Sequence, residues 1–154
     1  MISYFFDSSA LLKRYYAEQG TAWVHAITSI RAANSISIAQ ITPVEVISGI
    51  ARRQRNQQLS PRRAQVIRLL LDRHVRSEYK IVPLTDPIVN RAQDLVSLYP
   101  LRAYDVIQLA SALEDNIALI AAGFSPLIFV SSDTRLLVAA AAEGLPTDDP
   151  NNHP

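Results

Sequence analysis

Residues 2–12 read ISYFFDSSALL, and this stretch decides the fold. Its apolar and aromatic half, Ile2 to Phe6, predicts a short buried strand. Asp7 follows the strand directly, and the two serines after it can cap a helix that we expect to run to about Ala17. A strand that passes straight into a helix is the start of a repeating strand–helix pattern, so we expect a sheet with helices packed on it.

The alternation of strands and helices continues along the chain. Three more strands are predicted, at Ser35–Ala39, Tyr79–Leu84 and Leu127–Val130. Helices are predicted over about residues 21–33, 43–55, 61–76, 86–99, 104–121 and 134–143. A fifth strand has room after Gly144. The pattern predicts an α/β fold with a mostly parallel central sheet of four or five strands.

Length and composition narrow the class of protein. The 154 residues fit one domain, which we expect over residues 1–150, with residues 151–154 as a C-terminal tail. There is no cysteine, which excludes disulfides and thiolate metal sites and fits a cytoplasmic location. We find no signal peptide and no continuous apolar run of about 18 residues, so no membrane partner is expected.

The net charge of +1 implies no nucleic-acid partner, but the basic residues are unevenly distributed. Nine of the fifteen Lys and Arg residues lie between Arg52 and Lys80, where only Asp72 and Glu78 oppose them. This region is either a solvated helix face or a local binding surface for a polyanion or an acidic partner.

Four acidic residues lie near the edge of the predicted sheet where α/β proteins bind ligands, outside the carboxyl ends of the strands. Asp7 and Asp133 follow two of the strands, and Glu45 is in the first turn of the helix after a third. Asp105 begins the long helix that follows Pro100. We expect these four carboxylates to lie near one another.

Each of these acids also has a purely structural explanation. Asp7 and Asp133 can cap helices, residues 42–45 (TPVE) match a capping box, and a helix dipole favours Asp105. However, Glu45 and Asp105 lie within apolar segments, where an unpaired charge is costly. A divalent cation would offset the repulsion between four acids, and oxygen ligands without Cys suit Mg²⁺ or Mn²⁺ better than Zn²⁺.

Carboxylates around such a metal ion typically serve phosphoryl chemistry, in which the ion activates water and stabilises the leaving oxygen. The sequence offers no other catalytic arrangement. Its three histidines (His25, His74 and His153) have no partner acid in a recognisable motif, so we expect them to be surface or structural residues. The four glycines are too widely spaced for a phosphate-binding loop or a dinucleotide-binding motif.

Four stretches resemble, in order, the acidic motifs of PIN domains of the VapC type. They are YFFDSSALLK at residues 4–13, ITPVEV at 41–46, PLRAYDVIQLA at 100–110, and FVSSDTRLL at 129–137, the last followed by AEGL at 142–145. The third stretch is the most specific match. The matches run in the family's order from near residue 2 to about residue 150, so the resemblance extends over essentially the whole chain.

The resemblance implies a PIN-like three-layer α/β/α sandwich and endonucleolytic cleavage of RNA. It implies that Mg²⁺, or Mn²⁺, is bound and used in catalysis by the carboxylates of Asp7, Glu45, Asp105 and Asp133. For VapC-like members it also implies a homodimer that a small antitoxin protein silences.

Two hydroxyl groups are expected to support the acids. Ser131 stands two positions before Asp133, where members of the family often carry Thr, and Ser9 stands two positions after Asp7. Two further pairs have open interpretations. Arg14 and Arg102 could contact RNA phosphate or form ordinary ion pairs, and residues 15–16 (Tyr-Tyr) could stack on bases or pack in the core.

Two other functions remain open from the sequence. The chain could be a catalytically weak module that binds RNA or a protein through the Arg52–Lys80 region, with the acids acting only as caps. It could also be an RNA-processing nuclease without a toxin role.

Overall fold

The computed structural model describes all residues from 1 to 154 and contains a single five-stranded sheet. The strands are β1 (Ser3–Phe6), β2 (Ser35–Ala39), β3 (Tyr79–Val82), β4 (Ile128–Val130) and β5 (Thr147–Asp148). Their order in the sheet is β3-β2-β1-β4-β5, and every pairing is parallel. The predicted α/β fold is confirmed, and the fifth strand follows Gly144.

Seven helices surround the sheet. They are α1 (Ser8–Leu12), α2 (Thr21–Thr28), α3 (Thr42–Arg55), α4 (Pro61–Ser77), α5 (Asp86–Leu98), α6 (Ala103–Ala121) and α7 (Thr134–Ala142). Two short 3-10 turns, η1 (Ile30–Ala32) and η2 (Pro150–Asn152), complete the chain. None of the helices has both the length and the apolar content that crossing a membrane requires.

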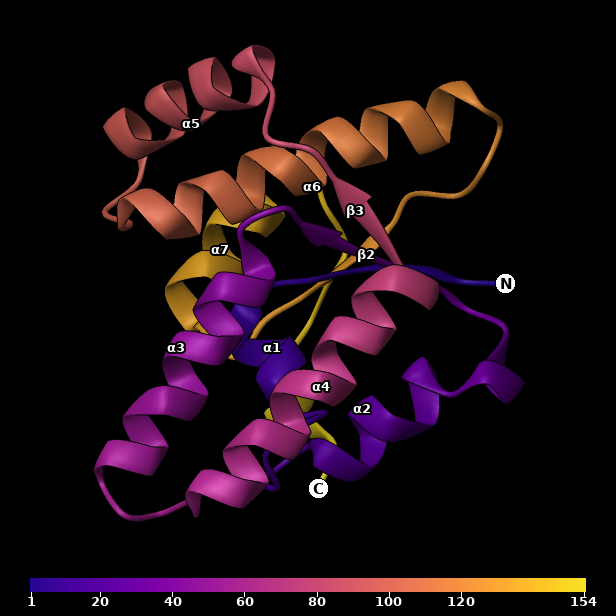
Figure 1. Ribbon diagram of the computed structural model, residues 1–154. Coiled ribbons are helices and arrows are strands. Elements are labelled where there is room, and N and C mark those ends of the chain that lie inside the picture. The colour runs from indigo at the N-terminus through magenta and orange to yellow at the C-terminus, as the bar shows by residue number, and fades with distance from the viewer.

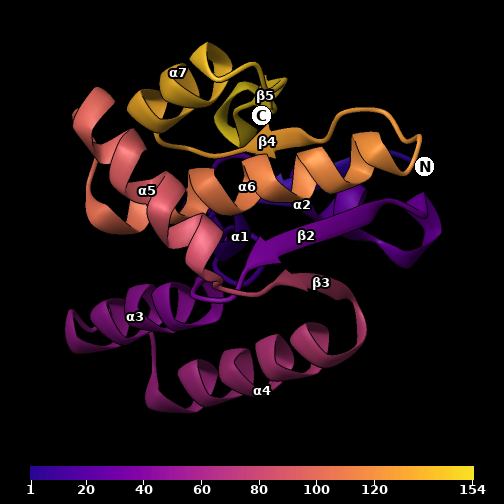
Figure 2. The ribbon, with the colours of Figure 1, turned by 90° about the horizontal axis from the view of Figure 1, so that it is seen from above.

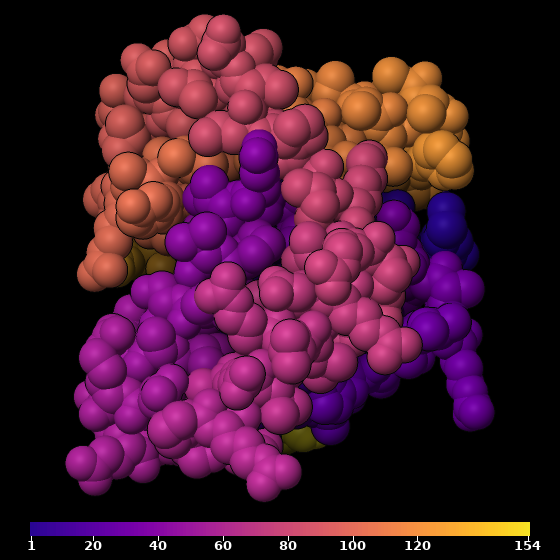
Figure 3. All heavy atoms as spheres, viewed as in Figure 1, coloured from indigo at the N-terminus to yellow at the C-terminus, as the bar shows by residue number.

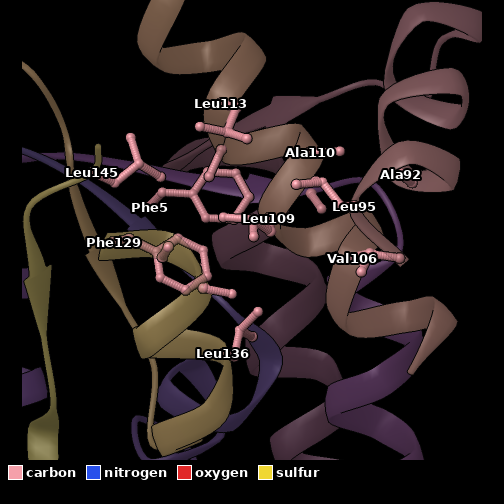
Figure 4. Close-up of a cluster of buried hydrophobic side chains, with 14 of the residues drawn as sticks. Phe5, Ala92, Leu95, Val106, Leu109, Ala110, Leu113, Phe129, Leu136 and Leu145 are labelled. Atoms are coloured by element: carbon pink, nitrogen blue, oxygen red, sulfur yellow. The ribbon is translucent and has the colours of Figure 1, made fainter. Parts of the chain in front are cut away.

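Helices cover both faces of the sheet and give the expected three layers (Figures 1 and 2). Helices α5, α6 and α7 pack on one face, and α1 to α4 pack on the other. Successive side chains of a strand point to opposite faces, so Phe5 joins the first core while Tyr4 and Phe6 join the second. In Figure 4, Phe5 lies beside Phe129, with Leu109 of α6 next to it; the two rings stack 5.8 Å apart.

The strand order places a crevice at the middle of the sheet. The chain adds β2 and β3 on one side of β1, and then returns to add β4 and β5 on the other side. In open α/β sheets, ligands bind at such a reversal, outside the carboxyl ends of the strands. Asp7 directly follows β1, and Ser131 directly follows β4. The sheet therefore brings two residues predicted for the site to its centre.

The first helix is shorter than the sequence suggested, because it ends at Leu12 rather than near Ala17. The Lys13 side chain turns inward, and this residue is only 4% exposed. A buried ammonium needs partners for its N–H groups. These partners are the Glu18 carboxylate, the Gln19 carbonyl and the Asn151 side-chain oxygen, at 3.2, 2.8 and 3.0 Å. The chain wraps around this ammonium instead of extending the helix.

The second helix also ends early, at Thr28 rather than near Ala33. Ser29 adopts an extended conformation, with ψ of 145°, which interrupts the helix. Its side chain accepts a hydrogen bond from the Ala32 N–H and so caps η1. The predicted single helix is therefore a helix followed by a separate 3-10 turn.

The C-terminal residues pack against the turn that precedes α2. Pro150 is buried beside Gly20, and the His153 ring stacks on the Trp23 ring with centroids 4.2 Å apart. His153 Nε2 also forms a hydrogen bond of 2.8 Å with Asp148 Oδ1. Asn151 and His153, which belong to the segment that the sequence suggested as a tail, are thus in contact with the rest of the fold.

Candidate metal centre and groove

Asp7 is the most enclosed of the four predicted acids, with 3% exposure. It caps α1 by accepting a hydrogen bond from the Ala10 N–H at 2.8 Å. Ser131 donates to Oδ2 at 2.6 Å, and Ser9 donates to both carboxylate oxygens at 2.8 and 2.9 Å. The two hydroxyls that the sequence singled out therefore both contact Asp7.

Burial raises the pKa of Asp7 to about 6. The hydrogen bonds from Ser131, Ala10 and Ser9 act in the opposite direction, because they stabilise the ionised form. The negative charge of Glu45 raises the pKa further. Asp7 is a buried carboxylate that is held in place by neutral donors and lacks a cationic partner.

Glu45 lies close enough to Asp7 for its charge to act on that carboxylate, and it contacts the first residue of α1. Ser8 donates to its Oε2 at 2.7 Å, and the Gln108 amide donates to its Oε1 at 3.0 Å. Burial and the charge of Asp105 raise the pKa of Glu45. The capping-box alternative is wrong for this residue, since Ile41 is the N-cap of α3 and makes no side-chain bond, while the Thr42 hydroxyl contacts Gln108.

Asp105 and Asp133 both bond to the start of their own helices. Asp105 accepts a hydrogen bond from the Arg102 N–H at 3.2 Å, and Asp133 accepts one from the Arg135 N–H at 2.9 Å. Burial raises the pKa of Asp105, and the charge of Asp133 raises it further, while Arg102 and Arg135 partly offset these effects. The capping role inferred from the sequence is therefore present for Asp133, as for Asp7, and Asp105 lies in the first turn of α6, where the helix dipole favours an acid.

The four acids are electrostatically linked. The charge of Glu45 acts on Asp7, that of Asp105 acts on Glu45, and that of Asp133 acts on Asp105. The structure has five ion pairs of Lys or Arg and two histidine–carboxylate contacts, and none of them includes any of these acids. The fold thus gathers negative charge at one place and does not neutralise it with Lys or Arg pairs.

A groove of about 660 Å³ borders this cluster, between α3 and the start of α6. Glu45 and Asp105 line the groove together with Ser8 and Ser9. Asp7 and Asp133 are not among its lining residues, and Asp7 lies beneath Ser9. In Figure 3 the groove opens on the left, between the orange start of α6 and the purple surface of α3.

Three arginines give the groove a basic rim: Arg52, Arg53 and Arg102. Arg53 is held in place, because its guanidinium stacks on the Tyr16 ring at 4.6 Å and pairs with Glu18. Arg52 and Arg102 are exposed and take part in no ion pair. Part of the basic region noted in the sequence therefore reaches the acidic cluster.

The chemistry of the groove fits a hard divalent cation, although the acids do not form a complete cage. No three Asp, Glu, His or Cys side chains lie close enough together to hold one metal ion by themselves. Mg²⁺ is usually held by one or two carboxylates, with water completing its shell. Glu45 and Asp105 can supply such oxygens at the groove. The pKa values of three of the acids are raised by burial and by the negative charge of their neighbours. A bound cation would favour the ionised carboxylates and lower these pKa values.

Several polar residues have roles that the sequence left open or missed. Arg14 pairs with Glu78 at 2.7 Å, and buried Tyr15 bonds to His74, so these residues are structural. Ser8 and Gln108, which hold Glu45, were missed. For Gln108 a signal was available, since it is a polar residue among apolar neighbours on a helix that begins near Asp105.

Comparisons with known proteins agree with the fold. A family model described as PIN domain matches residues 4–141. None of the curated proteins matches the sequence. The crystal structure of FitAcB from Neisseria gonorrhoeae has a TM-score of 0.66 and 17% identity, over 97% of this chain and 98% of that chain.

Two other solved structures are similar. VapBC2 from Rickettsia felis, bound to a DNA fragment from their promoter, gives a TM-score of 0.62 and 12% identity, over 96% of this chain and 98% of that one. A toxin-antitoxin complex from Klebsiella pneumoniae has a TM-score of 0.59 and 20% identity, over 96% of this chain and 97% of that chain. At these identities the likeness establishes a shared fold.

Proposed function

We propose that this chain, which belongs to the PIN-domain family as its four motifs predicted, is a metal-dependent endoribonuclease. The observation that carries the proposal is the cluster of carboxylates without ion-pair partners at the carboxyl ends of the central strands, bordered by a groove with arginines on its rim. Burial of this much negative charge is costly unless a cation compensates for it.

Glu45 and Asp105 would hold Mg²⁺ or Mn²⁺ at the groove, with Asp7 and Asp133 contributing charge or ligands beside them. A bound ion of this kind lowers the pKa of a water molecule and stabilises the charge on the leaving oxygen of a phosphodiester. Ser131 and Ser9 hold the Asp7 carboxylate in one orientation through their hydrogen bonds. The protein residues therefore position charge, and none is required to act as a nucleophile.

The rim of the groove suits an RNA backbone. Arg52 and Arg102 present exposed guanidinium groups beside the acids, and these can pair with phosphate oxygens. Tyr104 is 62% exposed and lines the same groove, so its ring is free to stack on a base. Substrate binding and metal binding would thus share one surface.

The test is cleavage of a mixed RNA pool by purified protein in Mg²⁺, in Mn²⁺ and in EDTA, beside an Asp7→Asn variant. We expect cleavage that needs the metal and disappears in the variant while the variant keeps its melting temperature. Equal cleavage by Asp7→Asn would remove Asp7 from the mechanism, and cleavage in EDTA would remove the metal.

The proposal extends to a toxin role. The similar structures include a complex described as toxin–antitoxin, which supports an antitoxin protein as partner. A cytoplasmic location is part of the same proposal. We expect expression of the chain alone to stop growth, and co-expression of a small DNA-binding protein encoded next to it to restore growth. Growth that continues when active nuclease is present would favour an RNA-processing role instead.

A homodimer is part of the same proposal. Its support is the presence of exposed apolar side chains on α5 and α6, among them Val96 at 44%, Ile117 at 58% and Ile120 at 51%. Light scattering of the purified protein measures its mass in solution, and therefore its oligomeric state, directly. A mass of one chain at micromolar concentration would contradict the dimer without affecting the site.

One observation favours a second candidate, a module that binds RNA or protein with little catalysis. Asp7, Asp105 and Asp133 all bond to helix starts, and no three acids converge on one point. Under this alternative, Mg²⁺ would leave the melting temperature unchanged. A rise in melting temperature with Mg²⁺ would favour the nuclease, because a ligand that binds only the folded state stabilises it.

A further inference from the structure

Gln108 is a buried polar residue whose surroundings are otherwise apolar. It lies on α6, one turn after Asp105, and is 1% exposed. Its neighbours in the chain, Ile107 and Leu109, belong to the core on that face of the sheet. A buried amide of this kind costs free energy unless its hydrogen bonds are satisfied. The partners of Gln108 therefore indicate why it is there.

The partners of Gln108 both lie on α3. Its Nε2 donates to Glu45 Oε1 at 3.0 Å and lies 3.0 Å from the Thr42 hydroxyl, which is also 3.2 Å from the amide oxygen. An ionised carboxylate only accepts hydrogen bonds, so the nitrogen end of the amide must face Glu45. Thr42, which is fully buried, gives the amide a second hydrogen-bond partner on α3.

Glu45 is consequently fixed from two sides. Ser8 at the start of α1 binds Oε2, and Gln108 from α6 binds Oε1. Residues three apart on a helix lie on the same face, so Gln108 and Asp105 project from α6 toward the same region. The amide thus links Glu45 to the helix that carries the other acid of the groove.

We propose that Gln108 is a positioning residue for metal binding, which holds Glu45 at the orientation and separation from Asp105 that a shared divalent cation requires. This inference rests on the proposed function. Groups that orient ligands in this way typically change metal affinity about 10- to 100-fold when they are removed. Gln108 itself contacts neither metal nor RNA in this account.

The experiment measures binding of Mn²⁺ alone by calorimetry, for the wild type, Gln108→Met and the control Ser111→Ala. Ser111 is equally buried on α6, and its hydroxyl donates only to the Ile107 carbonyl. Methionine keeps the length of the side chain and removes both amide groups. We expect Gln108→Met to bind Mn²⁺ about tenfold more weakly or worse, and Ser111→Ala to bind as the wild type does.

A merely structural role is separated by repeating the substitution in a Glu45→Gln background. If Gln108 acts through Glu45, Gln108→Met should cause little further loss of Mn²⁺ affinity there. An equal loss in both backgrounds would overturn the proposal. Should Gln108→Met fail to fold, Gln108→Asn keeps the amide but draws its nitrogen away from Glu45, and the same loss is expected.

The remaining outcomes distinguish this inference from the proposed function. Wild-type protein that binds Mn²⁺, with Gln108→Met binding it equally well, overturns the role of Gln108 alone. Wild-type protein that binds no Mn²⁺ overturns both the metal site and the inference built on it.

Discussion

The hydroxyl of Ser131 has the shortest contact to Asp7, at 2.6 Å, and it also accepts a hydrogen bond from the Asp133 N–H at 3.0 Å. We expect Ser131→Ala to lower the rate of RNA cleavage about 10- to 100-fold, because the carboxylate loses a donor that orients it. Ser131→Thr keeps the hydroxyl and should retain most activity. Single-turnover cleavage of one RNA measures both variants, and an unimpaired alanine variant would show that Asp7 needs no such support.

His74 should make stability depend on pH. Burial and nearby Arg14 lower the pKa of His74 from its ordinary value of 6.5, and its neutral ring contacts the Tyr15 hydroxyl at Nδ1. The unfolded chain therefore takes up this proton at a higher pH than the folded protein does. The stabilising contribution is present above pH 6.5 and is lost as the pH falls through the lowered pKa.

The matching measurement is thermal unfolding between pH 7.5 and pH 5 in EDTA, taking about 6.5 as the unfolded pKa. His74→Gln should reduce the loss of melting temperature over this range, while His25→Gln, at an exposed position on α2, serves as the control. An unchanged pH dependence in His74→Gln would assign the effect to other groups.

At the residue scale, the sequence predicts the acids better than their partners. Asp7 and Asp133 could be placed because each follows a predicted strand, and that position depends on local pattern alone. The bond between Glu45 and Gln108 could not be predicted, since it joins residues 63 positions apart on helices that meet only in the folded chain. The same limitation explains the wrong capping-box alternative for Glu45.

Among the elements, the turn before α2 depends on close packing with η2. Gly20 has a φ of +85°, and an added Cβ would lie 2.4 Å from the Pro150 carbonyl oxygen. Gly123 has a similar φ of +84° but open space around it, so it provides a matched control. Gly123→Ala should cost about 1–2 kcal/mol from backbone strain alone.

Gly20→Ala should lower the free energy of unfolding by clearly more than Gly123→Ala does. The same backbone strain is present at both positions, but at Gly20 the added methyl group also clashes with Pro150 and displaces the C-terminal segment. Denaturant unfolding of both variants gives the two free energies of unfolding. Equal losses would mean that η2 yields without cost and does not brace the turn.

The hairpin of α3 and α4 carries most of the basic side chains, but only some of them reach the groove. Arg52 lines the groove, whereas Arg76 is exposed near the far end of α4. In an Asp7→Asn background, Arg52→Ala should weaken RNA binding and reduce its slope against log salt by about 0.7. Arg76→Ala removes the same charge but should change the RNA affinity and its salt dependence less. Equal effects of the two substitutions would indicate that RNA binds a diffuse basic face rather than the groove.

Element ends were the weakest part of the sequence prediction. The starts of α3, α4 and α5, at Thr42, Pro61 and Asp86, could be placed to within one residue because a Pro in the first turn leaves a local signal. Only α4 has the side-chain cap that the sequence suggested, from Ser60. The early ends of α1 and α2 had no such signal. The first depends on a buried Lys13 whose partners include Asn151, far along the chain.

For the whole molecule, the alternation of strands and helices was enough to predict a parallel α/β sandwich. It was not enough to predict the order β3-β2-β1-β4-β5, because β1 to β4 are all short and largely apolar, so the sequence does not show which of them occupies the centre. That order matters, since it places the ends of β1 and β4 together and creates the crevice beneath the groove.

We propose that a metal ion held by these acids cleaves RNA with water as the nucleophile. The most direct measurement is the chemistry of the RNA ends left after cleavage in Mg²⁺, with Asp7→Asn and EDTA as controls. We predict fragments without a 2′,3′-cyclic phosphate, formed only by the wild-type protein and only with metal, because activated water attacks in place of the 2′-hydroxyl. Cyclic phosphate ends, or cleavage that persists in EDTA, would contradict the account and place the chemistry elsewhere in the molecule.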